Sequence, residues 1–285
     1  MSADRAVVPR DVPRLRGSLL VSELVTLFRR RRTQAILGVL AAVPILIAVA
    51  VRLSSGDGGG GGGPVLIDRI TRNGLFVGVT ALVVSIPLFV PLAIGVVAGD
   101  TIAGEANLGT LRYLLVAPAG RTRLLVVKYL GSAAFCLVAP LTVVLVGAGI
   151  GAALFPVGSV TLLSGDEVGV PESMLRALLV AGYVAVSMLG LSAVGLFVST
   201  LTEIPVGAMA ATVTLAITSQ ILDALPQVDW LHPYLMSHYW LSLGDLLRTP
   251  LSWDSFGSNA VLQAGYVLVF GALAWARLTT RDVLS

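Results

Sequence analysis

The fold class is decided by an uncharged apolar run at residues 130–154, which reads LGSAAFCLVAPLTVVLVGAGIGAAL. A bilayer core of ~30 Å needs ~20 residues of α-helix at ~1.5 Å of rise per residue, and the run exceeds that length. The chain of 285 residues is 56% hydrophobic and only 12% charged. Soluble domains carry roughly a quarter of their residues as charges, so we predict an all-α integral membrane protein.

Five further apolar runs of similar length predict five more transmembrane helices. The six predicted spans lie at residues 34–51, 75–98, 130–154, 175–200, 204–224 and 259–276. Together they form one transmembrane domain over residues 34–285, preceded by a cytoplasmic segment of residues 1–33. An even number of spans returns the chain to the side on which it began.

The positions of the 19 lysines and arginines predict that both termini are cytoplasmic, because cytoplasmic segments hold the excess of these residues. With the amino terminus inside, the cations that fall outside are Arg52, Arg69, Arg72, Arg176 and Arg248. The first 33 residues lack a small-residue cleavage site after their apolar stretch, so we expect no signal peptide. The cations show no aromatic interleaving, so we expect no nucleic-acid partner.

An amphipathic helix is predicted ahead of the first span. Its apolar positions recur at helical spacing, at Leu20, Leu24, Leu27 and Phe28. We predict that this helix lies in the membrane interface as an elbow. Four consecutive arginines follow it and are predicted to contact lipid headgroups, with contact to a cytoplasmic partner as the alternative: Arg29, Arg30, Arg31 and Arg32.

No catalytic or metal-binding motif is found in the sequence. Lys128 is the single lysine of the chain; it is followed by Tyr129 and lacks the glycine spacing of a phosphate-binding loop, so intrinsic ATP hydrolysis is not expected. His232 and His238 lie six residues apart, which does not place them on one helical face as a zinc pair. The single cysteine, Cys136, allows no intrachain disulfide.

Small residues and prolines within the spans predict packing and bending. Two pairs of glycines at a spacing of four predict close approach between helices: Gly95 with Gly99, and Gly147 with Gly151. Pro87 and Pro91 each remove a backbone donor from the second span and are predicted to bend it.

The cytoplasmic loop of residues 100–128 contains a short amphipathic pattern. Leu111, Leu114 and Leu115 have i, i+3, i+4 spacing, and Pro118 and Gly120 mark the end of the predicted short helix. A short amphipathic helix at the inner face of a membrane predicts a docking surface.

This loop resembles the coupling segment of ABC type-2 permeases. The resemblance rests on Glu105, followed by Gly109-Thr110-Leu111, Leu114-Leu115, Pro118, Arg121 and Lys128. The predicted elbow helix, the six spans, the long outer loop before the last span and the short basic tail of residues 277–282 are also similar to that family. The resemblance therefore covers nearly the whole chain.

The resemblance implies a membrane subunit of an exporter in the cell membrane, paired with a second permease copy or a paralogue. It implies that ATP and Mg bind to a separate ABC ATP-binding subunit, so that this chain holds no cofactor and is not itself an enzyme. The residues implied in coupling to that subunit are Glu105, Gly109, Thr110, Leu111, Arg112, Leu114, Leu115 and Arg121. Arg112 and Arg121 have an equal alternative as ordinary cytoplasmic charges.

The outer loop of residues 225–258 is rich in aromatic residues, as in an interfacial belt. Four of them are predicted to form an outer gate: Trp230, Tyr234, Tyr239 and Trp240. Two alternatives to the ABC exporter stay open, an ion-gradient-driven secondary transporter and a membrane scaffold that recruits a cytoplasmic protein. No residue selects the substrate, although a hydrophobic lateral path would favour an antibiotic or a lipid-like compound.

Overall fold

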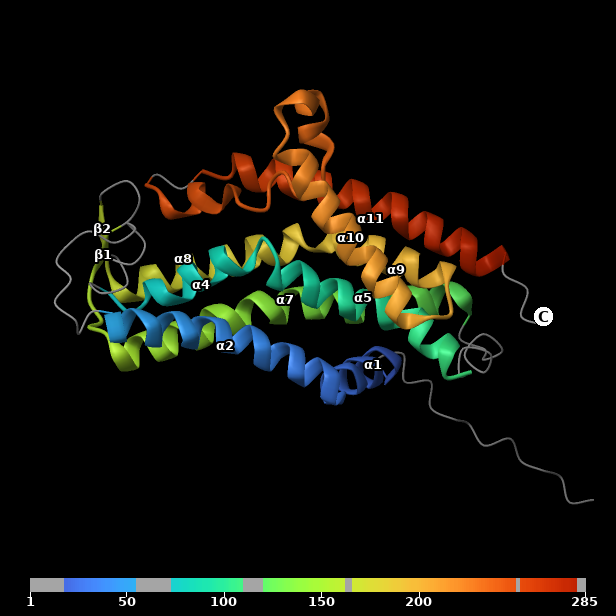
Figure 1. Ribbon diagram of the computed structural model, residues 1–285, viewed down its shortest axis with the longest axis horizontal. Helices are drawn as coiled ribbons and strands as arrows, with labels where there is room; N and C mark the ends of the chain where they lie inside the picture. Colours follow the sequence, from blue (N-terminus) through green and yellow to red (C-terminus); the bar gives the residue numbers. More distant parts are fainter. Residues whose placement is uncertain (1–17, 55–72, 110–119, 162–165, 250–251, 281–285) are drawn as a thin grey trace, which may run out of the picture.

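The computed structural model describes residues 18–54, 73–109, 120–161, 166–249 and 252–280, and this part of the chain is almost entirely α-helical (Figure 1). Six stretches of helix are long and apolar enough to cross a membrane. They are Arg31–Ser54, Phe89–Asn107, Arg121–Leu154, Val170–Leu201, Pro205–Asp223 and Asp254–Thr280. The prediction of an all-α chain with six candidate membrane spans is confirmed.

The elements follow one another along the chain as helices with two short strands between the third and fourth spans. The helices are α1 (Ser18–Arg29), α2 (Arg31–Ser54), α4 (Phe76–Ser85), α5 (Phe89–Asn107), α7 (Arg121–Leu154), α8 (Val170–Ser187), α9 (Leu189–Leu201), α10 (Pro205–Asp223), the 3₁₀ helices η1 (Pro226–Tyr234) and η2 (Ser242–Leu247), and α11 (Asp254–Thr280). The strands β1 (Val160–Thr161) and β2 (Glu167–Val168) pair antiparallel, with Val160 opposite Val168.

The second predicted span, residues 75–98, differs from the structure at both its middle and its end. It is divided into α4 and α5, which are separated at residues 86–88 around Pro87. Pro91 lies in the first turn of α5, where a missing N–H removes no helical bond. The helix then continues to Asn107, so the first eight residues assigned to the loop of residues 100–128 are helical. Gly109, at φ 69°, takes the left-handed conformation that ends many helices.

Two other spans also differ in extent from the prediction. The third begins at Arg121, nine residues before the predicted residue 130, because the charged residues that precede the apolar run are also helical. The fourth is built from α8 and α9, which meet at Met188.

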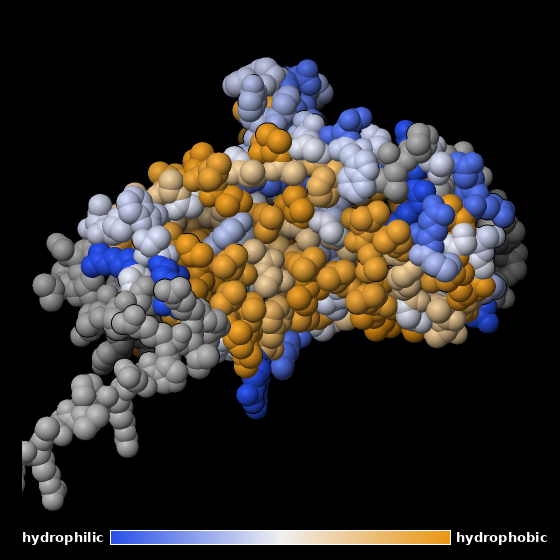
Figure 2. Space-filling view, turned by 180° about the vertical axis from the view of Figure 1, so that it is seen from behind, coloured by the Kyte–Doolittle hydropathy of each residue, from blue (hydrophilic) through white to orange (hydrophobic). Residues whose placement is uncertain are grey.

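Two helices organise the bundle: α9 packs against α5, α10 and α11, and α7 packs against α2, α4 and α8. The buried core includes Phe135, Tyr183, Met188 and Leu191. The surface between the two ends of the bundle is mainly apolar, and hydrophilic residues gather toward the ends (Figure 2). That distribution suits a multi-pass membrane protein.

The predicted glycine pairs lie where helices touch. A Cβ added at Gly147 would lie 2.4 Å from Cα of Gly78 in α4, and one added at Gly99 would lie 2.8 Å from Cα of Met209 in α10. Only glycine fits such distances between two backbones, so both predicted pairs take part in close helix contacts.

Two amide side chains of α11 are buried against neighbouring elements. Asn259 Nδ2 donates to Ser187 Oγ of α8 at 2.7 Å, and Gln263 Nε2 donates to the carbonyl of Met236 at 3.0 Å. Both side chains are almost completely buried although α11 is the least buried of the six candidate spans. These bonds therefore add polar contacts to a helix that otherwise packs mainly against α9.

Candidate functional site

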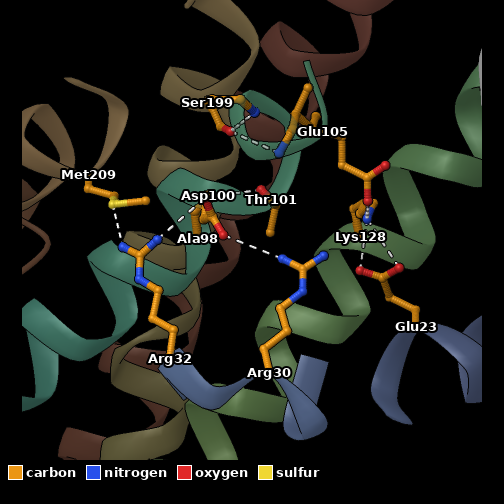
Figure 3. Close-up of polar contacts among 12 residues, drawn as sticks. Glu23, Arg30, Arg32, Ala98, Asp100, Thr101, Glu105, Lys128, Ser199 and Met209 are labelled. Carbon is orange, nitrogen blue, oxygen red and sulfur yellow. Dashed lines mark hydrogen bonds and ion pairs between the residues drawn. The ribbon is translucent and has the colours of Figure 1, made fainter. Parts of the chain in front are cut away.

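Charged residues from three separate parts of the chain meet at one end of the bundle (Figure 3). We call this group the α1–α5–α7 cluster. It consists of Glu23, Arg30, Arg32, Asp100, Glu105 and Lys128. The C-terminal end of α11 lies at the same end of the bundle (Figure 1).

Lys128 joins two carboxylates from different helices. Its Nζ lies 2.9 Å from Glu23 Oε1 of α1 and also donates to Glu105 Oε1 of α5, and its side chain is only 3% exposed. An ammonium removed from water is costly to bury without partners, and the two carboxylates offset that cost. Gly131, one turn further along α7, leaves room for α1, since a Cβ there would lie 3.4 Å from Glu23 Cγ.

Asp100 holds the junction between α1 and α2. Its carboxylate lies 3.4 Å from Arg30 Nη1 and 3.5 Å from Arg32 Nη1. Gly104 stands one turn further along α5, where a Cβ would lie 2.7 Å from Asp100 Oδ1. Arg32 also donates to Met209 Sδ of α10. The two arginine side chains are 36% and 45% exposed, so these pairs are more screened by solvent than the Lys128 pairs.

A neutral contact lies between the two charged groups. Ser199 Oγ of α9 accepts hydrogen bonds from the backbone N–H groups of Ile102, at 2.9 Å, and Ala103, at 2.8 Å. Thr101 Oγ1 donates to the carbonyl of Ala98 at 2.6 Å. Figure 3 shows these bonds in the stretch of α5 between Asp100 and Glu105.

The predicted coupling residues are only partly described by the structure. Glu105 lies in the last turn of α5 with its carboxylate toward Lys128, and Gly109 follows the end of that helix. Arg121 opens α7 and donates to the carbonyls of Leu278 and Thr279 at the end of α11, at 3.1 and 2.8 Å. The remaining predicted residues lie outside the described ranges: Thr110, Leu111, Arg112, Leu114 and Leu115.

A helix, α1, forms at the residues predicted for the elbow, and its apolar face packs on α7 of the same chain. Leu24 and Phe28 are half-buried, and the Phe28 ring lies 6.4 Å from that of Phe135 in α7. The arginine run divides between two environments. Arg30 and Arg32 pair with Asp100, whereas Arg29 and Arg31 are exposed.

The four aromatic residues predicted to gate the outside lie in different environments. Trp230 and Tyr234 are 73% and 67% exposed in η1, which projects from the side of the bundle between its two ends (Figure 1). Tyr239 is half-buried and its carbonyl accepts from Tyr183 Oη, and Trp240 is buried in the core. Exposure therefore leaves Trp230 and Tyr234 as the accessible members of the predicted gate.

The two histidines each lie next to an aspartate. His238 Nδ1 is 2.7 Å from Asp223 Oδ1 at the end of α10, and His232 Nδ1 is 3.3 Å from Asp229 Oδ1 in η1. Within the described ranges no three histidine, cysteine or acidic side chains converge as a metal site would require.

Sequence reasoning missed the pairing of Glu23 and Asp100 with cations far away in the chain. Lys128 could have indicated such an ion pair, because a lysine close to a long apolar run needs a nearby carboxylate. The sequence gives no sign of which carboxylate that is, since Glu23 lies 105 residues away.

Residues 68–284, more than half of the chain, match the model of a family described as Protein of unknown function (DUF2705). A comparison with curated proteins gave no match. The family description states no activity, so a functional proposal must come from the residues and their arrangement.

Proposed function

We propose that this chain, which belongs to the DUF2705 family, is the transmembrane permease subunit of an ATP-driven ABC exporter. A separate ATP-binding subunit hydrolyses ATP with Mg, and this chain supplies the substrate path. The observation that carries the proposal is Lys128, which holds Glu23 of α1 and Glu105 of α5 at the start of α7.

The cluster supports coupling because it links the helices on both sides of the segment that resembles a coupling helix. That segment lies between α5 and α7, with Glu105 in the last turn of α5 and Lys128 about two turns inside α7. Separating a buried charge from its partners is strongly unfavourable. A displacement of the segment is therefore passed to α5, α7 and α1 together.

This arrangement changes the proposed role of Glu105. Its carboxylate binds Lys128 and is only 15% exposed, so it positions the coupling segment rather than forming the main contact with the ATPase. Direct docking is left to the leucines of residues 111–115 that the resemblance implies.

We place the α1–α5–α7 cluster at the cytoplasmic face, with both termini inside and α1 as the elbow helix. Support comes from the exposed Arg29 and Arg31 near the cluster and from Arg121, which holds the end of α11 there. Cations favour the cytoplasmic side and anionic headgroups. The protein is then a multi-pass protein of the cell membrane.

A second permease copy is placed beside α10 and η1. The Asp229 side chain is 89% exposed on η1, which projects from a side of the bundle that is otherwise largely apolar (Figures 1 and 2). Ionisable groups among membrane helices face protein or a water-filled path rather than lipid. The exposed face of α10 next to η1 carries small residues at helical spacing, Gly207, Ala211, Thr214 and Thr218, which favour close helix approach.

One observation favours the alternative of an ion-gradient-driven transporter. His238 and Asp223 form a partly buried pair at the end of α10, and such pairs occur in proton pathways. A proton gradient that drives transport in vesicles without ATP would select this alternative.

The decisive experiment is purification of the tagged chain from its native membrane in mild detergent, with identification of copurifying proteins and measurement of ATP hydrolysis. We expect a stoichiometric ABC ATP-binding subunit. Glu105→Arg, which places a cation against Lys128, is expected to release that subunit, whereas Asp254→Asn at the exposed start of α11 is a matched control without effect.

Folding is checked by a monodisperse elution profile, and Glu105→Gln serves as a milder variant. A folded wild-type chain that purifies without any ATPase would overturn the proposal. Unchanged association and transport in Glu105→Arg would remove Glu105 from the coupling mechanism.

A further inference from the structure

One turn before Glu105, the hydrogen-bond ladder of α5 has a competing acceptor from another helix. In an uninterrupted α-helix, Ile102 N–H donates to the carbonyl of Ala98 and Ala103 N–H to that of Gly99. Ser199 Oγ of α9 lies within hydrogen-bond distance of both N–H groups. The Ala98 carbonyl in turn accepts from Thr101 Oγ1.

Each of the two buried N–H groups therefore has two possible acceptors, the Ser199 hydroxyl and a carbonyl of α5. A hydroxyl oxygen accepts two hydrogen bonds, which matches the two N–H groups that face Ser199. Neither N–H loses all its acceptors if the helix changes between the serine-bound and the regular arrangement. A change that leaves no buried donor unpaired is inexpensive, so this stretch of α5 can occupy either arrangement.

The two parts of α5 on either side of the Ser199 contact differ in their closest contacts, although Ile102 and Ala106 also pack in a cluster that contains Leu196 of α9. Before it, Gly99 packs on the backbone of α10, and Ala98 packs against Gly195 of α9, where an added Cβ would lie 2.6 Å from the Ala98 Cβ. After it, Glu105 is bound to Lys128 of α7, which also binds Glu23 of α1. A side chain inserted into the helical ladder is a recognised cause of a kink.

We propose that Ser199 is a positioning residue that makes a hinge in α5 at residues 98–103. The last turn of the helix, with Glu105, moves as one unit with α1 and the start of α7, relative to α10 and to the part of α5 that precedes residue 98. The role of this hinge in coupling rests on the proposed function, but the hinge itself is a property of the chain alone.

The test is hydrogen exchange of the α5 amides in the full-length chain purified in detergent. In Ser199→Ala the competing acceptor is gone, and the amides of Ile102 and Ala103 return to the regular ladder. We expect their exchange to become about tenfold slower, because the transitions between the two acceptors, during which each N–H is briefly unpaired, no longer occur. Thr101→Val frees the Ala98 carbonyl for Ile102 and is expected to act in the same direction, whereas Thr101→Ser keeps the hydroxyl and restores wild-type exchange.

The matched control is Ser192→Ala. Ser192 lies on the same helix and is equally buried, but its hydroxyl pairs with Ser132 of α7 at 2.7 Å, so exchange in α5 should not change. Faster or unchanged exchange in Ser199→Ala would overturn the hinge, because Ser199 would then be a fixed acceptor for two otherwise unpaired donors.

The coupling role is measured as transport per ATP hydrolysed in the purified complex, which we expect to fall about tenfold in Ser199→Ala, the same factor as the shift between the two arrangements. Unchanged transport per ATP would overturn that role. Slower exchange in a chain that copurifies with no ATPase would support the hinge and reject the proposed function.

Discussion

Replacement of Lys128 by methionine should destabilise the chain more than any other single change in the α1–α5–α7 cluster. Methionine has a similar length and is apolar, so the variant leaves Glu23 and Glu105 facing each other without the ammonium between them. Breaking a buried ion pair costs about 3–5 kcal/mol. The two carboxylates are 21% and 15% exposed, so water offsets part of that cost and we expect about 3 kcal/mol.

The glutamate variants give a different magnitude from the same geometry. In Glu23→Gln or Glu105→Gln the amide oxygen still accepts from Lys128, and the other carboxylate is retained. Each should cost about 1–2 kcal/mol, because one hydrogen bond to a charged acceptor becomes a weaker bond to a neutral acceptor. The triple variant, with Lys128→Met and both glutamines, contains no isolated charge and should return to within about 1 kcal/mol of the wild type.

The chain provides its own reporter for this measurement. Cys136 is the single cysteine and is 0% exposed, so a fluorogenic thiol reagent labels it only when the bundle opens. At roughly 2–4 °C per kcal/mol, Lys128→Met should lower the apparent midpoint of thermal labelling by about 6–12 °C. Asp254→Asn should melt as the wild type does. The reasoning is refuted if Lys128→Met melts no lower than the single glutamine variants, or if the triple variant melts as low as Lys128→Met.

Two further changes test helix packing and the anchoring of η2. Gly147→Ala places a Cβ 2.4 Å from Cα of Gly78, so α7 and α4 must separate and the folded yield should fall sharply. In the control Gly149→Ala, the new Cβ meets no atom within 4 Å, and the protein should accumulate as the wild type does. Arg176→Met removes the donors to two carbonyls at the end of η2 and should cost about 2–4 kcal/mol of stability. Thermal labelling of Cys136 measures that cost, and proteolysis around η2 should become faster. Unchanged proteolysis would contradict this expectation.

The transmembrane spans could be predicted from sequence because a span is set by length and composition alone. The ends of the spans could not. α5 continues past residue 98 and α7 begins at Arg121, because beyond the bilayer core their polar residues are paired inside the protein rather than left in a loop. A hydropathy scale cannot detect such pairing, since a charged residue has the same hydropathy index whether it is paired with another side chain or solvated by water.

The candidate site shows the same limit more clearly. Glu105 and Lys128 could be singled out by the resemblance to a coupling segment, but both fell in a predicted loop, and Glu105 was expected to contact a partner. Their actual contact, and the addition of Glu23, depends on how α1 folds back on α7, which is a property of the tertiary structure. Ser199 gave no signal, because a serine in an apolar helix is ordinary until the helix that it touches is known.

The buried amides of α11 have a consequence for biogenesis. This helix is synthesised after the other five described spans, and it presents Asn259 and Gln263 to the insertion machinery without their partners. Polar side chains lower the tendency of a helix to partition into lipid on its own. We therefore expect α11 to leave the translocon only when α8 and α9 are already assembled to receive it. Nascent chains with a defect in α8 or α9 should then be retained and degraded before membrane insertion is complete.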